Sequence, residues 1–579
     1  MRSERPGIAA SLGIAVGPAH VIPRMGGASH HKARDASAEA ERLRDAVEAS
    51  RTEIETAKDA FAGGGETAFV LDAQLLMHRD DALLNAALRY VERDGVNAEW
   101  ALEKAVDELK APLEAAGSKY FRERALDIAH MGQHILRHLR GGLDRLDLPA
   151  GRVVIVATDL SPADAVRLLG DTRVCGLVTE VGSSTSHTAL LARALEVPAV
   201  VGVGPVLDGI ANGCDTIVDG LRGRVVLDPR DEELEDAEKR GRRFRRFASD
   251  LRKKSEEPAK SLDGVPIALM ANIELPAEAM AARAHGAQGI GLYRTEFLFL
   301  DREDAPGEDE QVAVYRDVID ACGERPIVVR TLDLGGDKLP ARWRVEAGPN
   351  PALGLRAVRL TLHRPELLRT QVRAVLRAAK HGTLDLMFPL VEGPDRMREL
   401  RAVVEDCREE LVREGVEHEA VRVGAMVEVP SAALMCAELA READFLSVGT
   451  NDLVQYTLAV DRGNADVARW ADPLHPAVLR LLAMIVRGAG DTPLAMCGDM
   501  AADPIALPVV LGLGYRSFSV PAVSLPFAQE LVRRVDVTEL ASLAEALLET
   551  TPDAPRARVA VAETLAPTLG TLWAEQGVS

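Results

Sequence analysis

The sequence has few of the features that mark a secreted, membrane or metal-cluster protein. Its six cysteines lie far apart with no Cys-x-x-Cys pair, which argues against both a disulfide framework and a zinc cluster. No apolar run approaches the ~20 residues of a membrane-spanning helix, and the N-terminus lacks the charged and apolar regions of a signal peptide. These absences predict a protein of the cytoplasm with no membrane partner.

Basic residues are outnumbered by acidic ones, and aromatic residues are scarce. The formal net charge is −20, which argues against nucleic acid as a partner and favours a basic protein partner. An anionic substrate would therefore need a local basic pocket. Hydrophobic residues make up 47% of the 579 residues, and aromatic residues only 4%. This composition suits helices and parallel strands, so we expect an α/β protein of roughly two to four domains.

One stretch, residues 176–195, combines a strand, a loop and a helix. An apolar run ends at Gly182, small hydroxylic residues follow, and apolar residues then recur at helical spacing. His187 falls at the opening of that helix, where unpaired N–H groups and the positive dipole end favour a neutral imidazole and welcome an anion. The stretch therefore predicts a nucleophilic histidine that can accept a phosphoryl group.

Polar side chains near His187 fit the same chemistry. The hydroxyls of Thr185 and Ser186 would meet a phosphoryl group on the imidazole, and Arg193, about two turns further on, could reach back to it. Taken alone, the short motif favours a capping loop that holds an incidental histidine. The second half of the chain favours the phosphoryl acceptor.

Before residue 228 the patterns indicate strands, a helical insertion and a compact α/β region. Residues 8–21 indicate strands too short for a domain, so we expect them to pair with strands much later in the chain. The apolar spacing predicts a four-helix insertion with a kinked or split hairpin, from helical segments at residues 35–61, 66–77, 80–93, 97–115 and 119–140. The α/β region is predicted to hold strands at 153–155, 174–178, 199–203, 216–218 and 224–227, and helices at 162–169 and 188–194.

Residues 228–260 are densely charged, acidic first and basic later. This order complements the dipole of a long solvated helix, so we interpret the segment as a linker between domains. A nucleic-acid-binding basic helix is the alternative, and the acidic net charge argues against it.

From Val265 onward, apolar strand-like runs alternate with amphipathic helices. Eight such units over the rest of the chain predict a (β/α)₈ barrel. The strand candidates are residues 267–271, 289–292, 327–331, 384–389, 423–427, 445–449, 494–497 and 517–519.

Charged residues cluster where these strands end, which places them at one mouth of the barrel. Glu428 and Asp452 form a pair of hard oxygen ligands suited to Mg²⁺. Five basic residues also lie there, which is more positive charge than ion pairing within the fold would require. Any one of these basic residues alone would more often form a surface ion pair. A small anion with phosphate and carboxylate groups, bridged by Mg²⁺, satisfies both halves of the site. The basic residues are Arg294, Arg330, Lys338, Arg356 and Arg462.

These motifs resemble the Enzyme I family of the bacterial phosphoenolpyruvate-dependent sugar phosphotransferase system, over nearly the whole chain. Thr-Ser-His at His187 is similar to the family's phosphohistidine motif. The barrel carries similar segments in the same order: Gly-Leu-Tyr-Arg-Thr-Glu-Phe-Leu, Asp-Leu-Gly-Gly-Asp-Lys, Gly-Thr-Asn-Asp-Leu-Val-Gln-Tyr and Ala-Val-Asp-Arg-Gly-Asn.

The resemblance implies a division of the chain and a reaction. It implies a phosphohistidine α/β domain (1–22 and 146–227), a helical domain that docks the phosphocarrier HPr (23–145), the linker (228–260) and a phosphoenolpyruvate-binding TIM barrel (261–579). Phosphoenolpyruvate would phosphorylate His187 and leave as pyruvate, and HPr would then receive the phosphoryl group. A homodimer through the barrel is also implied. So is a swing of the histidine domain between the barrel and the docked carrier.

The resemblance further implies roles for individual residues. Arg294, Arg330 and Arg462 would hold the phosphoryl and carboxylate groups, Arg356 and Lys338 would line the pocket, and Asn451 would hydrogen-bond the substrate beside Asp452. Ser161 would add a hydroxyl near the phosphohistidine, and it would also serve as a helix N-cap. HPr docking would involve residues 70–81, and His130 and His134 stand where the family commonly has Asp and Arg.

Cys497 in Met-Cys-Gly-Asp is implied to be the acid that protonates the enolate. Its thiol would tend toward thiolate beside Mg²⁺ and arginines, so we expect a carboxylate such as Asp499 to hold its proton. The opposing interpretation is that Cys497 is a buried small apolar residue.

Two other interpretations share much of this sequence pattern. Phosphoenolpyruvate synthase and pyruvate phosphate dikinase need a large nucleotide-binding domain, for which residues 23–145 are too short, and the chain has no Gly-x-x-x-x-Gly-Lys-[Ser/Thr] motif. A regulatory protein that binds phosphoenolpyruvate without turnover is the alternative from another class. The presence of His187, Glu428, Asp452 and Cys497 argues against it.

Overall fold

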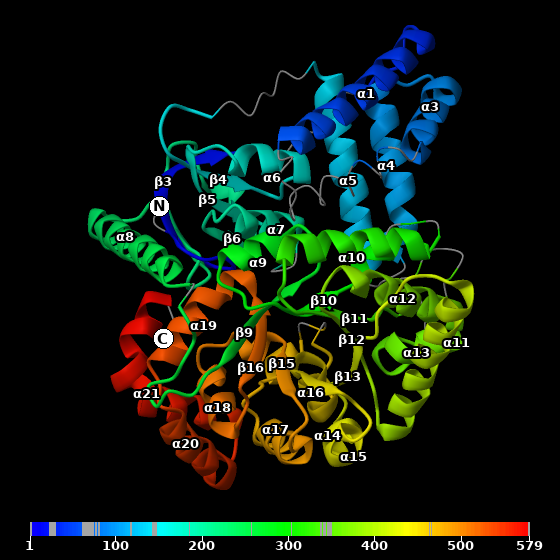
Figure 1. Cartoon of the computed structure of the whole chain (residues 1–579). Helices are drawn as coiled ribbons and strands as arrows, with labels where there is room; N and C mark the ends of the chain where they lie inside the picture. Colours follow the sequence, from blue (N-terminus) through cyan, green and yellow to red (C-terminus); the bar gives the residue numbers. More distant parts are fainter. Residues whose placement is uncertain are drawn as a thin grey trace. The chain divides into compact units, whose positions relative to one another are not determined.

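The computed structural model divides into two compact units, an N-terminal unit up to Arg246 and a barrel unit from Phe247 onward (Figure 1). It describes residues 3–22, 30–60, 75, 78, 81–115, 119–141, 148–183, 186–255, 257–300, 302, 304–335, 339, 343, 345, 350–462, 464 and 466–576.

An eight-stranded sheet forms the centre of the N-terminal unit, in the order β1-β8-β7-β3-β4-β5-β6-β2. Strands β3 to β6 run parallel, while β7, β8, β1 and β2 add antiparallel edges. The N-terminal strands thus pair with strands far along the chain, as the sequence predicts. The strands are β1 (Ser3–Pro6), β2 (Ile8–Ser11), β3 (Ile14–Val21), β4 (Val153–Ala157), β5 (Val174–Thr179), β6 (Ala199–Val201), β7 (Asp215–Asp219) and β8 (Arg224–Leu227).

Strand β4 is buried on both faces, and its side chains alternate between two hydrophobic cores. Val153 and Ile155 pack with helices α6 (Pro162–Leu169) and α7 (His187–Ala194), which cover one face of the sheet. Val154 and Val156 belong to the core on the opposite face. Because both faces of β4 are covered, apolar side chains are favoured at every position of the strand. This explains its continuous apolar sequence.

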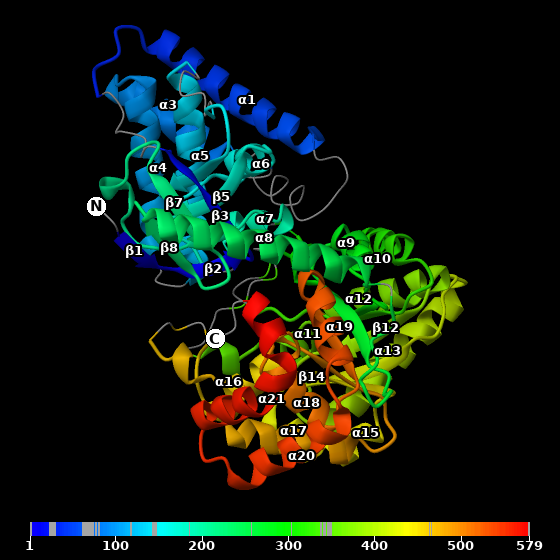
Figure 2. The same ribbon diagram turned by 90° about the vertical axis from the view of Figure 1, so that its left-hand side faces the viewer.

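In the described part of the segment between β3 and β4, four helices form a bundle (Figures 1 and 2). Their shared core includes Leu43, Leu83, Leu102 and Ile135, one from each helix. The predicted helix at 66–77 lies outside the described residues except for Leu75. The helices are α1 (Ala36–Ala60), α3 (Ala82–Asp94), α4 (Ala98–Ala115) and α5 (Lys119–Leu139).

Helix α8 (Asp231–Lys253) occupies most of the densely charged segment and contains the point at which the units divide. Its first turn is acidic and its last turn basic, as expected for a helix that its dipole stabilises. Ala237 and Leu234 pack on Ile14 and Ile217 of the sheet, so the first part of the helix belongs to the N-terminal unit.

Eight parallel strands close the barrel, and helices follow along the chain between them (Figure 1). The prediction of a multidomain α/β protein with a (β/α)₈ barrel is confirmed. The strands are β9 (Ala268–Ile273), β10 (Ile290–Arg294), β11 (Ile327–Arg330), β12 (Leu384–Phe388), β13 (Arg422–Val427), β14 (Phe445–Gly449), β15 (Leu494–Cys497) and β16 (Ser517–Pro521).

The barrel helices are α9 (Glu278–Ala284), α10 (Glu308–Cys322), α11 (Ala357–His363), α12 (Pro365–Ala378), α13 (Pro394–Glu414), α14 (Pro430–Leu434), α15 (Cys436–Ala440), α16 (Thr450–Leu458), α17 (Pro476–Ala489), α18 (Ala506–Leu513), α19 (Leu525–Arg533), α20 (Val537–Thr550) and α21 (Ala554–Gln576). In the described part of the chain, no helix combines the length and the apolar character that crossing a bilayer requires.

Side chains from five strands fill the barrel interior, so the barrel is a packed core. Phe445 is the largest of them. Its ring packs directly against Gly424, its partner on the neighbouring strand. A Cβ at Gly424 would come within 2.4 Å of the ring, so a larger residue would not fit there. The interior cluster consists of Leu292, Met387, Met426, Phe445 and Cys497.

We predict that Gly424→Ala destabilises the barrel by about 1–3 kcal/mol, because the ring of Phe445 must move to admit a methyl group. Gly570→Ala is the control, since no described atom lies within 4 Å of its Cβ position and it sits inside helix α21. That change should stabilise by up to about 1 kcal/mol. Urea unfolding measures both, and equal effects would contradict this account of the packing.

Candidate active site

Three carboxylates meet at the C-terminal mouth of the barrel. Glu428 follows β13, Asp452 lies in the first turn of α16, and Asp333 follows β11. One oxygen from each lies within 4.8 Å of the others, and the Glu428 and Asp452 residues are only 2% and 3% exposed. Burying three acidic groups together is costly unless cations compensate.

Arg356 supplies part of that compensation. Its Nη2 lies 2.8 Å from Asp333 Oδ1 and 2.9 Å from Asp452 Oδ2, and Nη1 donates to the Tyr456 hydroxyl at 3.2 Å. Arg356 is the residue that precedes α11, where its extended backbone allows the side chain to reach both carboxylates. One guanidinium thus joins the segment between β11 and α11 to helix α16.

Arg330 is the second buried cation. Its Nη2 donates to Glu296 Oε1 at 2.7 Å, and its Nη1 pairs with Asp333 Oδ2 at 3.1 Å. Burial alone would raise the pKa of Asp333, but Arg330 and Arg356 together hold that pKa below its usual value. Asp333 therefore stays ionised between the two arginines.

Two further arginines lie nearer to solvent. Arg294 Nη1 donates to Glu274 Oε1 at 2.6 Å, and Arg462 Nη2 pairs with Asp452 Oδ1 at 3.2 Å. Each of these four arginines therefore already has a carboxylate partner. An anionic substrate must take over some of these pairs.

Glu428 differs from the other carboxylates because burial, and then the charges of Asp333 and Asp452, raise its pKa to about 8. Its Oε1 accepts a hydrogen bond from the Leu390 backbone N–H at 2.6 Å. A metal cation would offset the repulsion that keeps this carboxyl protonated.

The donor set fits both a hard cation and an anion. Asp452 Oδ1 is buried and has the ion pair with Arg462 but no hydrogen bond from a described residue, and Arg330 Nε is buried without a described acceptor. Buried polar atoms without hydrogen bonds are costly in a native core. Mg²⁺ on the carboxylates and an anion on the arginine would satisfy both.

Asn451 and Cys497 lie beside this network. Asn451 Oδ1 accepts from the Asp499 backbone N–H at 2.9 Å. The Cys497 sulfur accepts from the Ser447 hydroxyl at 3.4 Å and lies 3.5 Å from the Val448 carbonyl oxygen. Burial raises the pKa of the Cys497 thiol, and the charge of Glu428 adds to the effect.

The expectation that Asp499 holds the thiol proton needs correction. Asp499 is exposed, and the sulfur's partners among the described residues are Ser447 and Val448. Burial in the barrel core keeps Cys497 protonated instead.

In the N-terminal unit, helix α7 begins at His187 as the sequence predicts. Ser186 is the N-cap, and its hydroxyl accepts from the Ala189 N–H at 3.3 Å. Gly182 has a φ of 123°, and a Cβ there would lie 3.3 Å from both Ser186 Oγ and Val201 Cβ. Glycine is therefore required where the strand turns into the loop.

Asp159 connects the start of α7 to the helical bundle. Its Oδ1 accepts from the Thr188 hydroxyl at 2.9 Å, and its Oδ2 lies 3.4 Å from His130 Nε2. Ser161 caps α6, accepting from the Asp164 N–H at 3.2 Å. Sequence reasoning missed Asp159, although it stands two residues before Ser161.

Arg193 and the predicted docking segment have contacts of their own. Arg193 Nε donates to the Ala10 carbonyl at 3.2 Å. Leu75 and His78 are buried, so these two side chains face the interior. Thr185, Lys338 and most of residues 70–81 lie outside the described residues, and their roles stay predictions.

Three family descriptions match the chain in succession. They are "PEP-utilising enzyme, N-terminal" at residues 6–124, "PEP-utilising enzyme, mobile domain" at 149–223, and "PEP-utilising enzyme, PEP-binding domain" at 248–537.

Curated relatives match over nearly the full length. "Phosphoenolpyruvate-protein phosphotransferase" of Bacillus sp. (strain S) and that of Geobacillus stearothermophilus are each 40% identical over 94% of this chain and 95% of their own. The same-named protein of Priestia megaterium is 39% identical over 93% of this chain and 95% of its own. The chain belongs to the phosphoenolpyruvate-protein phosphotransferase (Enzyme I) family. The resemblance drawn from the motifs is thereby confirmed.

Sequence reasoning on this family member missed the acidic partners of its arginines. Asp333, Glu296 and Glu274 each neutralise a predicted substrate-binding arginine. Asp333 and Glu296 lie inside the motifs quoted above. An acidic residue close in sequence to each arginine or lysine of those motifs was therefore the available sign of a charge partner.

We predict that Asp333→Asn lowers stability by about 1.5–3 kcal/mol, since charge-assisted hydrogen bonds to two buried arginines lose their ionised partner. Asp309→Asn is the matched control. Asp309 pairs with Arg377 at 2.7 Å, but its side chain is 90% exposed, so about 0–1 kcal/mol should be lost. Chemical unfolding compares them, and a loss at Asp333 no larger than at Asp309 would contradict the buried network.

Proposed function

We propose that this protein transfers the phosphoryl group of phosphoenolpyruvate to its own His187 and then to the phosphocarrier protein HPr, the first step of the sugar phosphotransferase system. The observation that carries the proposal is the buried network of arginines and carboxylates at the barrel mouth, in a chain that belongs to the Enzyme I family.

The arginines suit a substrate with phosphate and carboxylate at adjacent positions, because guanidinium groups match both geometries. Arg294, Arg330 and Arg462 hold the two anionic groups, and Asn451 hydrogen-bonds the substrate. Arg356 and Lys338 line the same pocket. Support comes from the ion pairs that Arg330, Arg356 and Arg462 form with Asp333 and Asp452, whereas Arg294 pairs with Glu274. Asn451 is the residue before Asp452.

Glu428 and Asp452 are proposed to hold Mg²⁺. The cation, when bound, supplies charge stabilisation to the transferring phosphoryl group. Asp452 would no longer fully neutralise Arg356 and Arg462 when it also binds the cation. These arginines would then be available to bind the substrate. Binding of the metal and of the substrate is thus expected to be coupled.

His187 is the proposed nucleophile. At the first position of α7 the helix dipole disfavours the imidazolium form, so a neutral ring can attack the phosphorus in line. The bond from phosphorus to the enol oxygen breaks, and the enolate is left. Ser161, Thr185, Ser186 and Arg193 form the environment of the phosphohistidine.

The enolate needs a proton on carbon to become pyruvate. Cys497 is the proposed acid: its sulfur gives up the proton and is reprotonated from solvent. The buried position, which raises the pKa of the thiol, supports this role because the proton is present before the phosphoryl group leaves.

The parts of the chain are proposed to divide the work as the family resemblance implies. Residues 23–145 dock HPr, residues 1–22 and 146–227 carry His187, residues 228–260 link the units, and residues 261–579 bind phosphoenolpyruvate and form a homodimer. His187 and the barrel mouth belong to different units, so transfer requires their approach. We place the reaction in the cytoplasm.

We predict that His187→Ala abolishes phosphorylation of the protein and of HPr while phosphoenolpyruvate still binds. Mass spectrometry of the protein incubated with phosphoenolpyruvate, Mg²⁺ and HPr measures this. His30→Ala, at a surface histidine paired with Glu103, is the control and should be phosphorylated normally. Phosphoryl transfer by the His187 variant would refute the assignment, and a wild type that binds but is never phosphorylated would favour a regulatory protein.

We predict that Cys497→Ala still phosphorylates His187 but forms pyruvate about 10²–10⁴-fold more slowly, because enolate protonation loses its acid. Solvent deuterium should enter pyruvate without stereospecificity. Cys436→Ala, a buried cysteine that lies in α15, should alter stability alone. Stereospecific protonation retained in Cys497→Ala would exclude the thiol as the acid.

A further inference from the structure

Two helices of the bundle bring two histidines and a glutamate together outside the active site. Glu53 lies on α1, and His134 and His138 lie one turn apart on α5. His138 Nε2 is 2.8 Å and His134 Nε2 is 3.4 Å from the same oxygen, Glu53 Oε2. One ligand atom from each residue lies within 4.8 Å of the other two.

Ser50 fixes the orientation of the more buried histidine. His134 Nδ1 lies 2.5 Å from Ser50 Oγ, which in turn lies 2.9 Å from His78 Nε2. The hydrogen bonds of this chain can run in either direction. Ser50 can donate to His134 Nδ1, which leaves the His134 Nε2–H facing Glu53, or His134 Nδ1 can donate to Ser50 while the Ser50 hydroxyl donates to His78. In the second arrangement, the one that metal binding requires, the lone pair of His134 Nε2 faces Glu53.

His134 Nε2 is therefore an unusual atom. The side chain is fully buried, and Nε2 has no hydrogen-bond partner among the described residues. With the Nε2 lone pair toward Glu53, the two acceptors repel each other, and a buried polar atom without a hydrogen bond is costly. A cation placed between His134 Nε2, His138 Nε2 and Glu53 would relieve both penalties.

Glu53 is ionised and ready to act as a ligand. Interactions with His134 and His138, aided by the charge of Arg137, hold the pKa of its carboxyl far below the usual range. Arg137 Nη2 also contacts Glu53 Oε2 at 3.2 Å, but Arg137 has Asp164 as a second carboxylate partner. A bound cation therefore need not leave the arginine without a countercharge.

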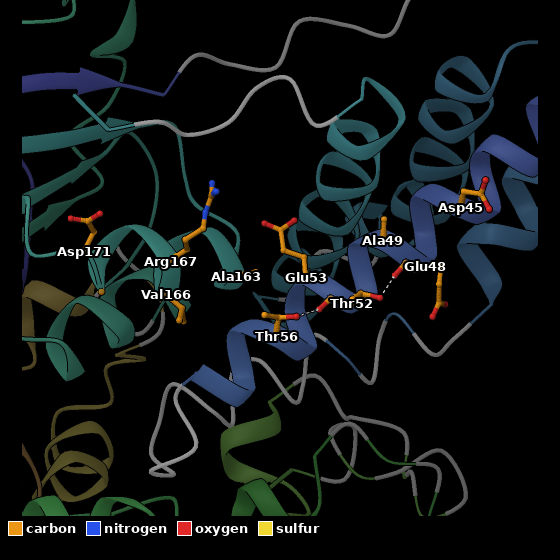
Figure 3. A pocket seen from close by; sticks show the side chains of 11 residues that line it. Asp45, Glu48, Ala49, Thr52, Glu53, Thr56, Ala163, Val166, Arg167 and Asp171 are labelled. Atoms are coloured by element: carbon orange, nitrogen blue, oxygen red, sulfur yellow. Dashed lines mark hydrogen bonds between the residues drawn. The ribbon is translucent and has the colours of Figure 1, made fainter. Parts of the chain in front are cut away.

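A cavity reaches the carboxylate of this cluster. It has a volume of about 920 Å³ and lies where α1 faces α6, as Figure 3 shows. Glu53 is one of its lining residues, with Asp45 and Glu48 on the same helix and Asp171 after α6. These acidic side chains would raise the local concentration of cations.

We propose that Glu53, His134 and His138 form a binding site for a divalent transition metal, Zn²⁺ being the best match, which joins α1 to α5. Imidazole nitrogens together with one carboxylate suit Zn²⁺, whereas Mg²⁺ prefers oxygen ligands. In a tetrahedral zinc site the ligand atoms lie about 3.3 Å apart, close to the His134–Glu53 separation. Ser50 orients His134 from behind the site, as outer partners of metal-bound histidines commonly do.

Zinc binding to the full-length protein tests the proposal. Titration against a chromophoric chelator is carried out in excess Mg²⁺, which occupies the barrel site. Wild type should bind one more equivalent of Zn²⁺ than His134→Gln/His138→Gln, and Zn²⁺ should raise the melting temperature of wild type alone. Because the wild-type measurement needs no variant to fold, failure of wild type to take up Zn²⁺ under these conditions refutes the proposal.

Two further variants distinguish a specific zinc site from nonspecific binding of zinc to surface histidines. His30→Gln removes an exposed histidine that pairs with Glu103 and should leave zinc binding unchanged. Ser50→Ala removes only the hydroxyl that orients His134 and should weaken zinc binding about 10–100-fold. Equal zinc binding by the double histidine variant and wild type would overturn the assignment, whatever the outcome for phosphoryl transfer.

Discussion

Buried charge at the barrel mouth must be balanced, and this constraint shapes the rest of the site. The side chains of Arg330 and Arg356 are only 11% and 15% exposed, so each requires a carboxylate, and Asp333 pairs with both. The same pairing places Asp452 between Arg356 and Arg462. The residues that we propose to bind substrate and metal are therefore also the residues that neutralise one another before either ligand is present.

A parallel barrel makes such a network possible. The C-terminal ends of β11, β13 and β14 lie at one mouth, so residues about 120 positions apart, from Asp333 to Asp452, come within hydrogen-bonding distance of one arginine. The strands below are packed with apolar side chains, which exclude water and strengthen each ion pair. Burial raises the pKa values of Glu428 and Cys497, whereas Arg330 and Arg356 hold the pKa of the equally buried Asp333 below its usual value.

Much of this was predictable from sequence, and the limits have physical causes. The eight barrel strands are continuous apolar runs separated by helices, so their positions follow from local pattern. Asp333, Asp159 and Glu53 could not be predicted as partners, because their contacts join elements distant in sequence. Cysteine spacing likewise gives no sign of the cluster of Glu53, His134 and His138, because Glu53 precedes His134 by 81 residues in the sequence. The role expected for Asp499 was wrong because burial, which sequence does not reveal, governs the thiol.

The most direct test of the account is the dependence of phosphoenolpyruvate binding on Mg²⁺. Calorimetry in the His187→Ala background avoids turnover. If Glu428 and Asp452 hold the cation and thereby free the arginines, Mg²⁺ should strengthen phosphoenolpyruvate binding at least about tenfold, equivalent to about 1.4 kcal/mol. Glu428→Gln should abolish that dependence. Equal binding of phosphoenolpyruvate with and without Mg²⁺ would contradict the coupling between carboxylates and arginines on which the account rests.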